Sequence, residues 1–339
     1  MRSHEVKDIH PLLKDGLLSE PGWSRRLVQQ YHRKDIRAPR FRIKEWDYYL
    51  ILGSDFGVAL TISDDGYIGL QSVSLLLLGD HPWEHTETVL NAFPMGRLKL
   101  PEDSSVGITE YKDKRLQMRF VPENGTRHLT CHMDNFADGK SFECDITLRQ
   151  PDMDTLVIAT PWPQKHRFYY NQKINCMRAS GYASFDGKRY RFDPEKDFGT
   201  LDWGRGVWTY DNTWHWGSGN GIVDGHDFGF NVGYGFGDTS KATENILFCD
   251  GVGHKIDDVT FVIPEKSWTD PWKLTSSDGR FEMRFDPILD RAAKIDVKVI
   301  VTDQHQVFGR LNGKAVLDDG TVLNVSNLLC FFEKVHNKY

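Results

Sequence analysis

Residues that can do chemistry are concentrated between positions 198 and 229. This stretch holds four of the ten tryptophans of the chain: Trp203, Trp208, Trp214 and Trp216. Ionisable side chains alternate with them: Asp202, Arg205, Tyr210, Asp211, His215, Asp224, His226 and Asp227. Tryptophan supplies large rigid apolar walls with one N–H donor, and ionisable groups supply protons and charge. The mixture predicts a pocket with a few polar groups in it. A Trp-rich sheet core with turn residues between strands is the alternative.

Asp202 is the first candidate for proton transfer. It stands between Leu201 and Trp203, and apolar surroundings favour the neutral form of a carboxyl group, which can then donate a proton near neutral pH. Arg205, three residues later, would instead hold the carboxylate ionised. The sequence leaves open whether Asp202 is catalytic or forms a buried structural pair with Arg205.

His215 and Glu333 are further candidates. In an alternating strand, Trp214 and Trp216 share one face and His215 takes the other, so the sequence does not decide which of them face a pocket. Glu333 is an acid in an otherwise apolar final strand. The predicted catalytic residues are Asp202, His215, Glu333 and Tyr210. The predicted substrate-binding residues are Trp203, Arg205, Trp208, Trp214, Trp216, Asp211 and His226. The nearby Arg42, Lys44 and Glu45 are interpreted as a solvated strand face.

Other site chemistries lack the required patterns. No HxH, HExxH or two-His-one-carboxylate spacing is present, so we expect no metal and no cofactor. The chain has no Gly-x-Ser-x-Gly elbow and no complete dinucleotide fingerprint. The five cysteines are scattered without a CxxC pair, which predicts free buried thiols.

Composition narrows the class of partner. The 339 residues carry a net charge of −6 and no basic stripe, so nucleic acid is not an expected partner. No apolar run approaches the roughly 20 residues of a membrane span, and the N-terminus lacks the apolar part of a secretion signal. We expect a cytoplasmic protein that binds a small molecule. The sequence does not indicate the oligomeric state.

Turn signals and period-two segments predict an all-β chain. Asx-Gly pairs, which favour tight hairpin turns, occur at 65–66, 124–125, 138–139, 186–187, 250–251, 278–279, 312–313 and 319–320. Helical periodicity is best at 22–31, within a short helical or irregular preface. The segment 115–122 (RLQMRFVP) matches 280–287 (RFEMRFDP), and 181–188 resembles 309–314. This repeat predicts two antiparallel β-barrel or sandwich units in tandem, with an N-terminal segment 1–40 and domains 41–200 and 201–339.

Several motifs resemble the family known as DUF2804, a domain of unknown function. They are Arg42-Ile-Lys-Glu-Trp-Asp-Tyr48, Leu201-Asp-Trp-Gly-Arg-Gly206 with Trp214-x-Trp216-Gly217, Pro271-Trp272 followed by Arg284-Phe-Asp-Pro287, and Glu333. More distantly, the repeated β units are similar to the tandem lipocalin-like architecture of carotenoid 1,2-hydratases and AttH-type proteins. That resemblance implies apolar or phenolic ligands, and hydration or cyclisation without a cofactor through acidic and aromatic residues. It assigns no catalytic acid to a particular residue.

Three functional hypotheses follow. The first is a cofactor-independent enzyme that acts on a small apolar or glycosidic molecule by general acid–base catalysis, through hydration, elimination, isomerisation or cyclisation. The second is a carbohydrate-active enzyme that cleaves a glycosidic bond between two carboxylates. The third is a non-catalytic lipocalin-like binding protein. A carrier should have a dry apolar cavity, whereas an enzyme should bring two or more titratable groups to one cavity wall.

Overall fold

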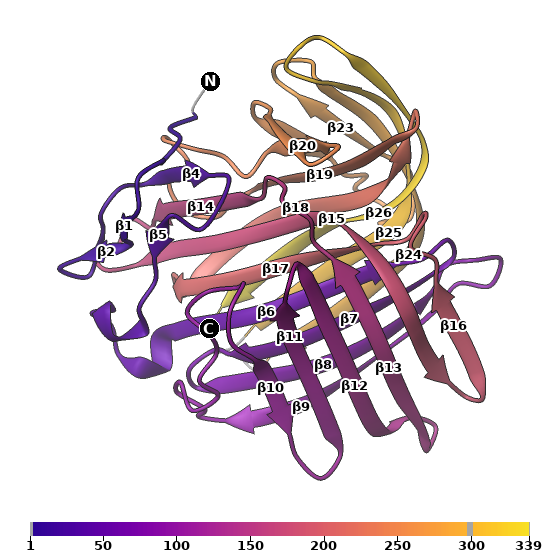
Figure 1. Ribbon diagram of the computed structural model, residues 1–339, viewed down its shortest axis with the longest axis horizontal. Coiled ribbons are helices and arrows are strands. Elements are labelled where there is room, and N and C mark those ends of the chain that lie inside the picture. Colours follow the sequence, from indigo (N-terminus) through magenta and orange to yellow (C-terminus); the bar gives the residue numbers. More distant parts are fainter. Residues whose placement is uncertain (1–2, 297–300, 339) are drawn as a thin grey trace.

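The computed structural model describes residues 3–296 and 301–338 and confirms the all-β prediction. Two curled antiparallel sheets carry most of the chain (Figure 1). In spatial order, the first contains β10 (Thr109–Lys112), β11 (Leu116–Glu123), β12 (Thr126–Ala137), β13 (Lys140–Arg149), β15 (Phe168–Phe185), β17 (Phe198–Val207), β6 (Ile43–Leu52), β7 (Phe56–Asp64), β8 (Ile68–Leu77) and β9 (Trp83–Ala92). Also in this sheet, β14 (Leu156–Pro161) and β16 (Lys188–Phe192) pair with β15, and β4 (Gly22–Ser24) pairs with β14.

The second sheet forms the other half of the molecule, drawn in salmon, orange and yellow in Figure 1. In spatial order it contains β21 (Val252–Lys255), β20 (Ile246–Cys249), β19 (His226–Tyr234), β18 (Asp211–Val223), β26 (Val322–Lys338), β25 (Val301–Val316), β24 (Phe281–Asp296), β23 (Trp272–Ser276) and β22 (Val259–Val262). The chain leaves the first sheet after Val207 and enters the second at Asp211. The predicted division at residue 200 therefore falls inside β17, and whether the two parts are separate domains stays a prediction.

The N-terminal segment contains short elements. They are β1 (His10–Pro11) paired with β5 (Gln29–Gln30), β2 (Leu13–Lys14) paired with β3 (Leu17–Leu18), and 3₁₀ helices η1 (Arg33–Asp35) and η2 (Arg40–Arg42). The helix predicted at 22–31 is wrong, because β4 and β5 occupy that range. Trp23 in β4 pairs with Ile158 of β14 and packs between the two sheets, and this tertiary pairing outweighs local periodicity. Among the described residues, no helix has the length and apolar character needed to cross a bilayer.

Hairpin turns follow the Asx-Gly prediction closely. All of the predicted pairs except Asn312-Gly313 connect successive antiparallel strands. In the β12–β13 turn, for example, Asp138 and Gly139 both have positive φ angles, 50° and 77°, as a tight hairpin turn requires. Asn312-Gly313 instead lies inside β25, where the pairing with β26 shifts register.

The repeat is partly reflected in the sheets. The two Met-Arg-Phe segments lie in β11 and β24, and each buries its methionine and phenylalanine while exposing the arginine between them. The other matched pair is not equivalent. Gly309 lies directly opposite Pro287 of β24, whereas Gly181 lies in β15, which is separated from β11 by two strands.

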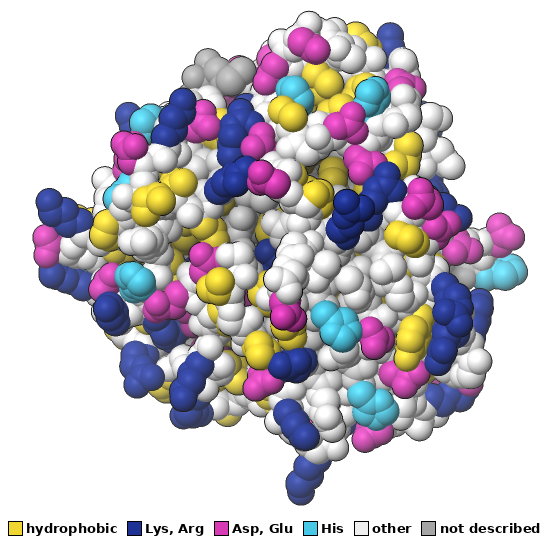
Figure 2. All heavy atoms as spheres, viewed as in Figure 1, with side chains coloured by type: hydrophobic (Ala, Val, Ile, Leu, Met, Phe, Trp, Pro, Cys, Tyr) yellow, Lys and Arg dark blue, Asp and Glu magenta, His cyan; other side chains and the backbone are white. Residues whose placement is uncertain are grey.

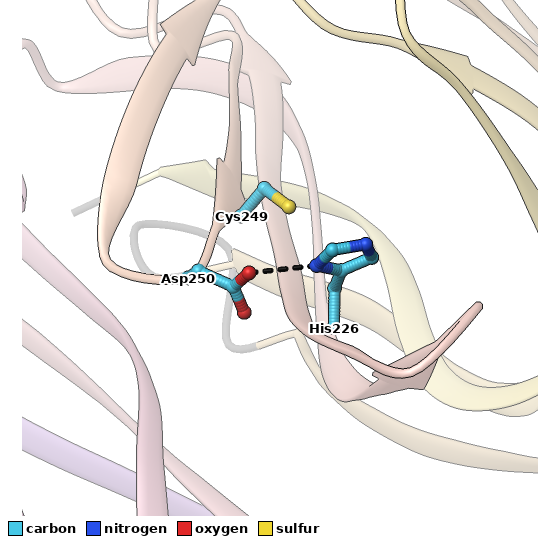
Figure 3. A group of neighbouring side chains, drawn as sticks. All are labelled: His226, Cys249 and Asp250. Atoms are coloured by element: carbon cyan, nitrogen blue, oxygen red, sulfur yellow. Dashed lines mark hydrogen bonds and ion pairs between the residues drawn. The ribbon is translucent and has the colours of Figure 1, made fainter.

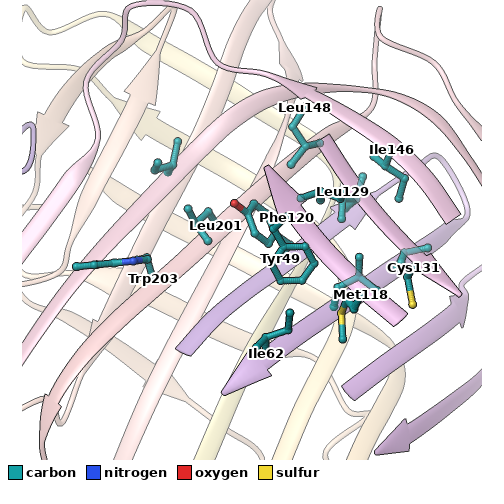
Figure 4. Packing of buried hydrophobic residues seen from close by; sticks show 14 of the residues in the cluster. Tyr49, Ile62, Met118, Phe120, Leu129, Cys131, Ile146, Leu148, Leu201 and Trp203 are labelled. Carbon is teal, nitrogen blue, oxygen red and sulfur yellow. The ribbon is translucent and has the colours of Figure 1, made fainter. Parts of the chain in front are cut away.

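Apolar side chains form three layers. One core fills the curl of the first sheet and contains Tyr49, Phe120 and Trp203 (Figure 4). Another fills the curl of the second sheet around Phe285 and Phe332. The third lies between the sheets and contains Trp208, Trp216, Phe236 and Phe331, among others. The curls of both sheets are therefore packed with side chains, and the layer between the sheets is where aromatic and polar groups mix.

The surface shown in Figure 2 carries charges of both signs. Basic and acidic side chains are interspersed on that face. All five cysteines are buried and free, as expected.

Candidate active site between the two sheets

A cavity of about 240 Å³ lies where the faces of the two sheets meet. Its lining comes from both sheets: Lys44, Trp46, Thr61, Ser63, Asp65, Leu70, Ser72, Tyr169, Lys173, Asp202, Trp208, Trp214, Trp216, Phe236 and Glu333. Indole rings form much of the wall, with Trp208 5.7 Å from Trp46 and 5.4 Å from Trp214 between ring centroids. Several titratable groups share this one cavity, so it meets the criterion for an enzyme more closely than that for a dry apolar carrier.

Strand register explains how the first sheet contributes to the cavity. On β17, Asp202 and Gly204 face the cavity while Trp203 and Arg205 face the opposite side, because side chains alternate along a strand. Asp202 lies opposite Lys173 of β15 on one side and Tyr48 of β6 on the other. The motifs at 42–48 and 201–206 therefore lie on the neighbouring strands β6 and β17, and each strand presents every second residue to the cavity.

Gly204 makes room for one aromatic wall. It lies opposite Trp46 of β6, and a Cβ atom at Gly204 would be 2.0 Å from Cζ2 of that indole. Glycine at this position therefore lets the ring of Trp46 lie across β17, which explains the Trp-Gly part of the motif in physical terms.

Asp202 is paired with Lys173 at one end of the cavity. Its Oδ2 is 3.0 Å from Nζ of Lys173, and its Oδ1 accepts a hydrogen bond of 2.5 Å from Nδ2 of Asn171. Nζ of Lys173 also lies 3.8 Å from the ring centroid of Trp216. The carboxyl group of Asp202 therefore has a basic side chain on one oxygen and an amide donor on the other.

Glu333 reaches the same cavity from β26 but has different partners. Nε1 of Trp214 donates to Oε1 and Nε2 of Gln306 donates to Oε2, both at 2.9 Å. Burial raises the pKa of Glu333, against the opposing effects of these two donors and of Lys173 and Arg291. The cavity therefore combines a carboxyl group beside the amine of Lys173 with a second carboxyl group whose pKa is raised by burial. Two carboxyl groups in such different surroundings can serve as a base and an acid.

Glu244 extends this acidic cluster behind the cavity. The residue is 1% exposed, and burial raises its pKa, with Lys173 opposing and Asp202 reinforcing the shift. The pKa of Tyr169, which lines the cavity, is raised by burial and by the charges of Glu244, Asp202 and Glu333. The hydroxyl group of Tyr169 interacts with Glu244, so this side chain links the cavity wall to the buried carboxyl group behind it.

Lys44 and Asp65 belong to the other end of the cavity. Burial lowers the pKa of Lys44 to about 8, with Asp65 opposing this shift and Arg42 adding to it. Burial also raises the pKa of Asp65. The interpretation of Arg42, Lys44 and Glu45 as a solvated face is wrong: Lys44 and Glu45 are buried, and Nη2 of Arg42 donates to the carbonyl oxygen of Trp208 at 2.9 Å.

Trp203 and Arg205 lie on the far side of β17, away from the cavity. Arg205 is fully buried, with Nη2 3.0 Å from Oδ1 of Asp47 and Nε 4.0 Å from Oε1 of Glu45. Its guanidinium also lies 4.1 Å from the centroid of the Trp203 ring. The suggested pair between Asp202 and Arg205 is therefore wrong, because residues three apart in a strand point to opposite faces.

His215 is also separated from the cavity. Trp214 and Trp216 face the cavity, whereas the His215 ring stacks on Tyr234 with centroids 4.4 Å apart and meets the edge of Phe261. Burial lowers the pKa of His215 to about 4, and Lys334 adds to the shift. Packing of a neutral imidazole against these two aromatic rings is sufficient to explain a histidine at position 215.

Tyr210 and Asp211 lie outside the cavity. The Tyr210 side chain is exposed, between β17 and β18. Asp211 forms ion pairs with Lys338 at 3.2 Å and His336 at 3.4 Å. These contacts bring the ends of β18 and β26 together at the surface.

His226 belongs to a surface cluster with Cys249 and Asp250 (Figure 3). The potential ligand atoms of these three side chains lie within 4.8 Å of one another. Nδ1 of His226 hydrogen bonds to Oδ2 of Asp250 at 2.7 Å, and Oδ1 accepts the backbone N–H of Asp227 at 2.9 Å. Burial raises the pKa of Cys249, which disfavours the thiolate that binds metals. These hydrogen bonds connect the ends of two neighbouring hairpins. The absence of a metal from the protein stays a prediction.

The sequence did not predict several of the residues that line the cavity: Lys44, Trp46, Tyr169 and Lys173. Lys44 and Trp46 belong to the motif at 42–48. They alternate with Glu45 and Asp47, so the sequence could have indicated that Lys44, Trp46 and Tyr48 share one face of a strand. Lys173 is part of no motif, and only the register of β15 against β17 places it beside Asp202.

Comparison with known proteins identifies the family. The family model described as "Domain of unknown function (DUF2804)" matches residues 3–339. The chain belongs to this family. No curated protein matches it.

Two solved structures of other proteins are similar to this chain. A putative AttH from Nitrosomonas europaea has a TM-score of 0.54 at 14% identity, covering 95% of this DUF2804 chain and 99% of its own. Kievitone hydratase from Nectria haematococca has a TM-score of 0.49 at 12% identity, covering 87% of this chain and 88% of its own. The likeness to the AttH protein supports the predicted relationship to that architecture at the level of fold.

Proposed function

We propose that this DUF2804 protein is a cofactor-independent enzyme of the hydratase or lyase type, with its active site in the cavity between the two sheets. The observation that carries the proposal is the contrast between two carboxyl groups in one cavity. Asp202 is paired with Lys173 at 3.0 Å, whereas Glu333 has neutral hydrogen-bond donors and a pKa raised by burial. Two carboxyl groups in such different surroundings are suited to divide the roles of base and acid in general acid–base catalysis.

Each group has a role in the proposed reaction. For addition of water to a carbon–carbon double bond, the Glu333 carboxylic acid donates its proton to one carbon. The Asp202 carboxylate accepts a proton from the water whose oxygen bonds to the other carbon. The same steps in reverse eliminate water. The proton gained by Asp202 can return to Glu333 through the water exchanged with solvent, so the enzyme ends each turnover unchanged.

The aromatic walls support this chemistry. Trp46, Trp208, Trp214 and Trp216 line the cavity, and their ring faces favour positive charge that develops on a carbon skeleton during protonation. Their apolar surface also excludes bulk water, which strengthens the electrostatic effect of Asp202 and Glu333.

An isotope experiment tests the proposal. Purified protein is incubated in ¹⁸O water with a panel of small aromatic alkenes and conjugated enones, and mass spectrometry detects incorporated oxygen. We expect incorporation by the wild-type protein and a loss of about 10²–10⁴-fold in Glu333→Gln and Asp202→Asn, the usual contribution of a general acid or base. The matched controls are Glu282→Gln and Asp80→Asn, which change exposed side chains.

Two outcomes of this experiment would reject the proposal. One is turnover that is unchanged in both cavity variants. The other is tight binding of panel compounds without turnover of any of them, which would favour the non-catalytic binding hypothesis. Aryl glycosides are included in the panel, and release of their aglycone would favour the glycosidase alternative.

A further inference from the structure

Lys44 is a buried amine that faces the cavity and has no role in the proposed hydration steps. It lies opposite Gly206 of β17, whereas Asp202 lies opposite Tyr48 of the same strand β6. The four residues from Lys44 to Tyr48 span about 13 Å of an extended strand. Lys44 therefore enters the cavity well separated from the Asp202–Lys173 pair, and the aromatic wall lies between them.

The surroundings of Lys44 suit an amine that reacts rather than one that only carries charge. Asp65 also lines the cavity and interacts electrostatically with Lys44. Oγ of Ser63 donates to Oδ2 of Asp65 at 3.1 Å, which positions that carboxyl group. Burial lowers the pKa of Lys44 to about 8, so part of the amine is neutral, and a neutral amine removed from solvent is an activated nucleophile.

We propose that Lys44 captures a carbonyl ligand by forming an imine, so that the substrates of this site are conjugated aldehydes or ketones. The inference rests on the proposed function because it names the substrate class of the same cavity. It follows from the placement of an amine, a neighbouring carboxyl and an aromatic wall on one side of the cavity that also holds Asp202 and Glu333.

The chemistry balances with groups present in the cavity. The neutral Lys44 amine attacks the carbonyl carbon, a C–N bond forms, and proton transfer gives a carbinolamine. Asp65 in its acid form donates a proton to the departing hydroxyl group, the C–O bond breaks, and water leaves as the imine forms. A protonated imine withdraws electrons along the conjugated chain. It therefore makes the distant double bond a better acceptor for the water that Asp202 activates.

Three lysines make a matched set for testing the inference. Lys44 lines the cavity and has a lowered pKa. Lys255 has a pKa lowered to about 7, and its Nζ donates to the carbonyl oxygen of Thr243 at 2.5 Å, but it is not part of the cavity wall. Lys173 lines the cavity but is paired with Asp202. If imine trapping requires both a place in the cavity wall and a lowered pKa, then of these three lysines only Lys44 should be modified.

The experiment traps the imine in the intact protein. Full-length protein is incubated with trans-cinnamaldehyde and sodium cyanoborohydride, and peptide mapping by mass spectrometry locates the alkylated lysines. We expect modification of Lys44 at least about tenfold above that of exposed lysines such as Lys7 and Lys99, as an activated amine predicts. trans-β-Methylstyrene, which has the same shape without the carbonyl, should protect Lys44 by occupying the cavity.

Variants separate the inference from the proposed function. Lys44→Arg should lose the selective modification, while Lys255→Arg should retain it; melting curves verify that both fold. If Lys44→Arg does not fold, the protection experiment on the wild-type protein still decides. Modification of Lys44 no greater than that of exposed lysines overturns the inference.

The two proposals can fail separately. Selective trapping that persists in Glu333→Gln and Asp202→Asn, with no hydration by any form of the protein, supports imine formation and rejects the proposed hydratase. Hydration of enones that is unchanged in Lys44→Arg supports the hydratase and overturns the role of Lys44.

Discussion

Nζ of Lys173 lies 3.0 Å from Oδ2 of Asp202, and the two residues stand directly opposite each other on the neighbouring strands β15 and β17. Both side chains are buried and both line the cavity between the sheets. A buried ion pair depends on both partners, because removal of one leaves an uncompensated charge. The pair is therefore both part of the proposed machinery and a buried contact between two strands of the first sheet.

Substitution of this pair should separate its catalytic and structural contributions. Lys173→Met leaves Asp202 buried without its cation and should lower the free energy of unfolding by about 3–5 kcal/mol. The double variant Lys173→Met/Asp202→Asn removes both charges and should recover part of that loss. Urea unfolding of the wild type, both single variants and the double variant forms the test. Additive losses in the double variant would show that the pair is not coupled.

Glu333 should give stability a recognisable pH dependence. Its folded-state pKa is raised above the ordinary value of 4.5, so the folded state binds more protons than the unfolded state between those two values. Its contribution to stability is present below pH 4.5 and is lost as the pH rises through the folded-state pKa. Because other buried carboxyls such as Glu244 behave alike, the measurement is the difference between wild type and Glu333→Gln. A difference that stays constant from pH 4 to neutrality would contradict the prediction.

His215 should produce the opposite slope. Its pKa is lowered from 6.5 to about 4 in the folded protein, so the unfolded state binds more protons between those values. The contribution is present above pH 6.5 and is lost as the pH falls toward 4. His215→Phe should flatten this part of the stability profile and leave turnover within about twofold, because the ring packs on Tyr234 outside the cavity. A large loss of turnover in the folded variant would restore His215 as a catalytic candidate.

Arg205 should affect stability and not chemistry. Arg205→Ala leaves Asp47 buried without its cation on the far side of β17, while Glu45 keeps Arg33 as a partner. The unpaired Asp47 should cost about 3–5 kcal/mol of stability. Thermal melting and turnover are measured on the same sample, with activity expressed per folded molecule. Loss of turnover at unchanged melting temperature would place Arg205 in the active site after all.

Gly204 should report on the shape of the cavity. Gly204→Ala places a Cβ atom 2.0 Å from Cζ2 of Trp46, so the indole must move, at a cost of about 1–3 kcal/mol for overpacking. Tryptophan fluorescence should shift and ligand binding should weaken. Gly79→Ala is the matched control, because its nearest neighbour would be at an ordinary 3.6 Å. A Gly204→Ala protein with the stability and fluorescence of the wild type would show that Trp46 is not constrained there.

Turn chemistry and strand alternation were sufficient to predict much of the fold. Asx-Gly pairs such as Asp138-Gly139 act through local backbone preferences, so they mark hairpins without any knowledge of distant residues. Local preferences gave the wrong prediction at 22–31, where pairing of Trp23 with Ile158 determines the structure. They were also misleading at Asn312-Gly313, which lies inside a strand at a shift in register.

The sequence by itself determined that this is an all-β chain and that acids and tryptophans are concentrated near Asp202. It also contained the two motifs that supply adjacent strands of the site. Only the tertiary structure decided which residues face the cavity. Strand parity separates Asp202 from Arg205, but the partner of each depends on the register of β17 against β15 and β6. Glu333 reaches the cavity of Asp202 because the two sheets pack face to face, whereas Lys173 and Lys44 reach it through the pairing of β15 and β6 with β17. Such long-range pairing and packing leave no local pattern in the sequence.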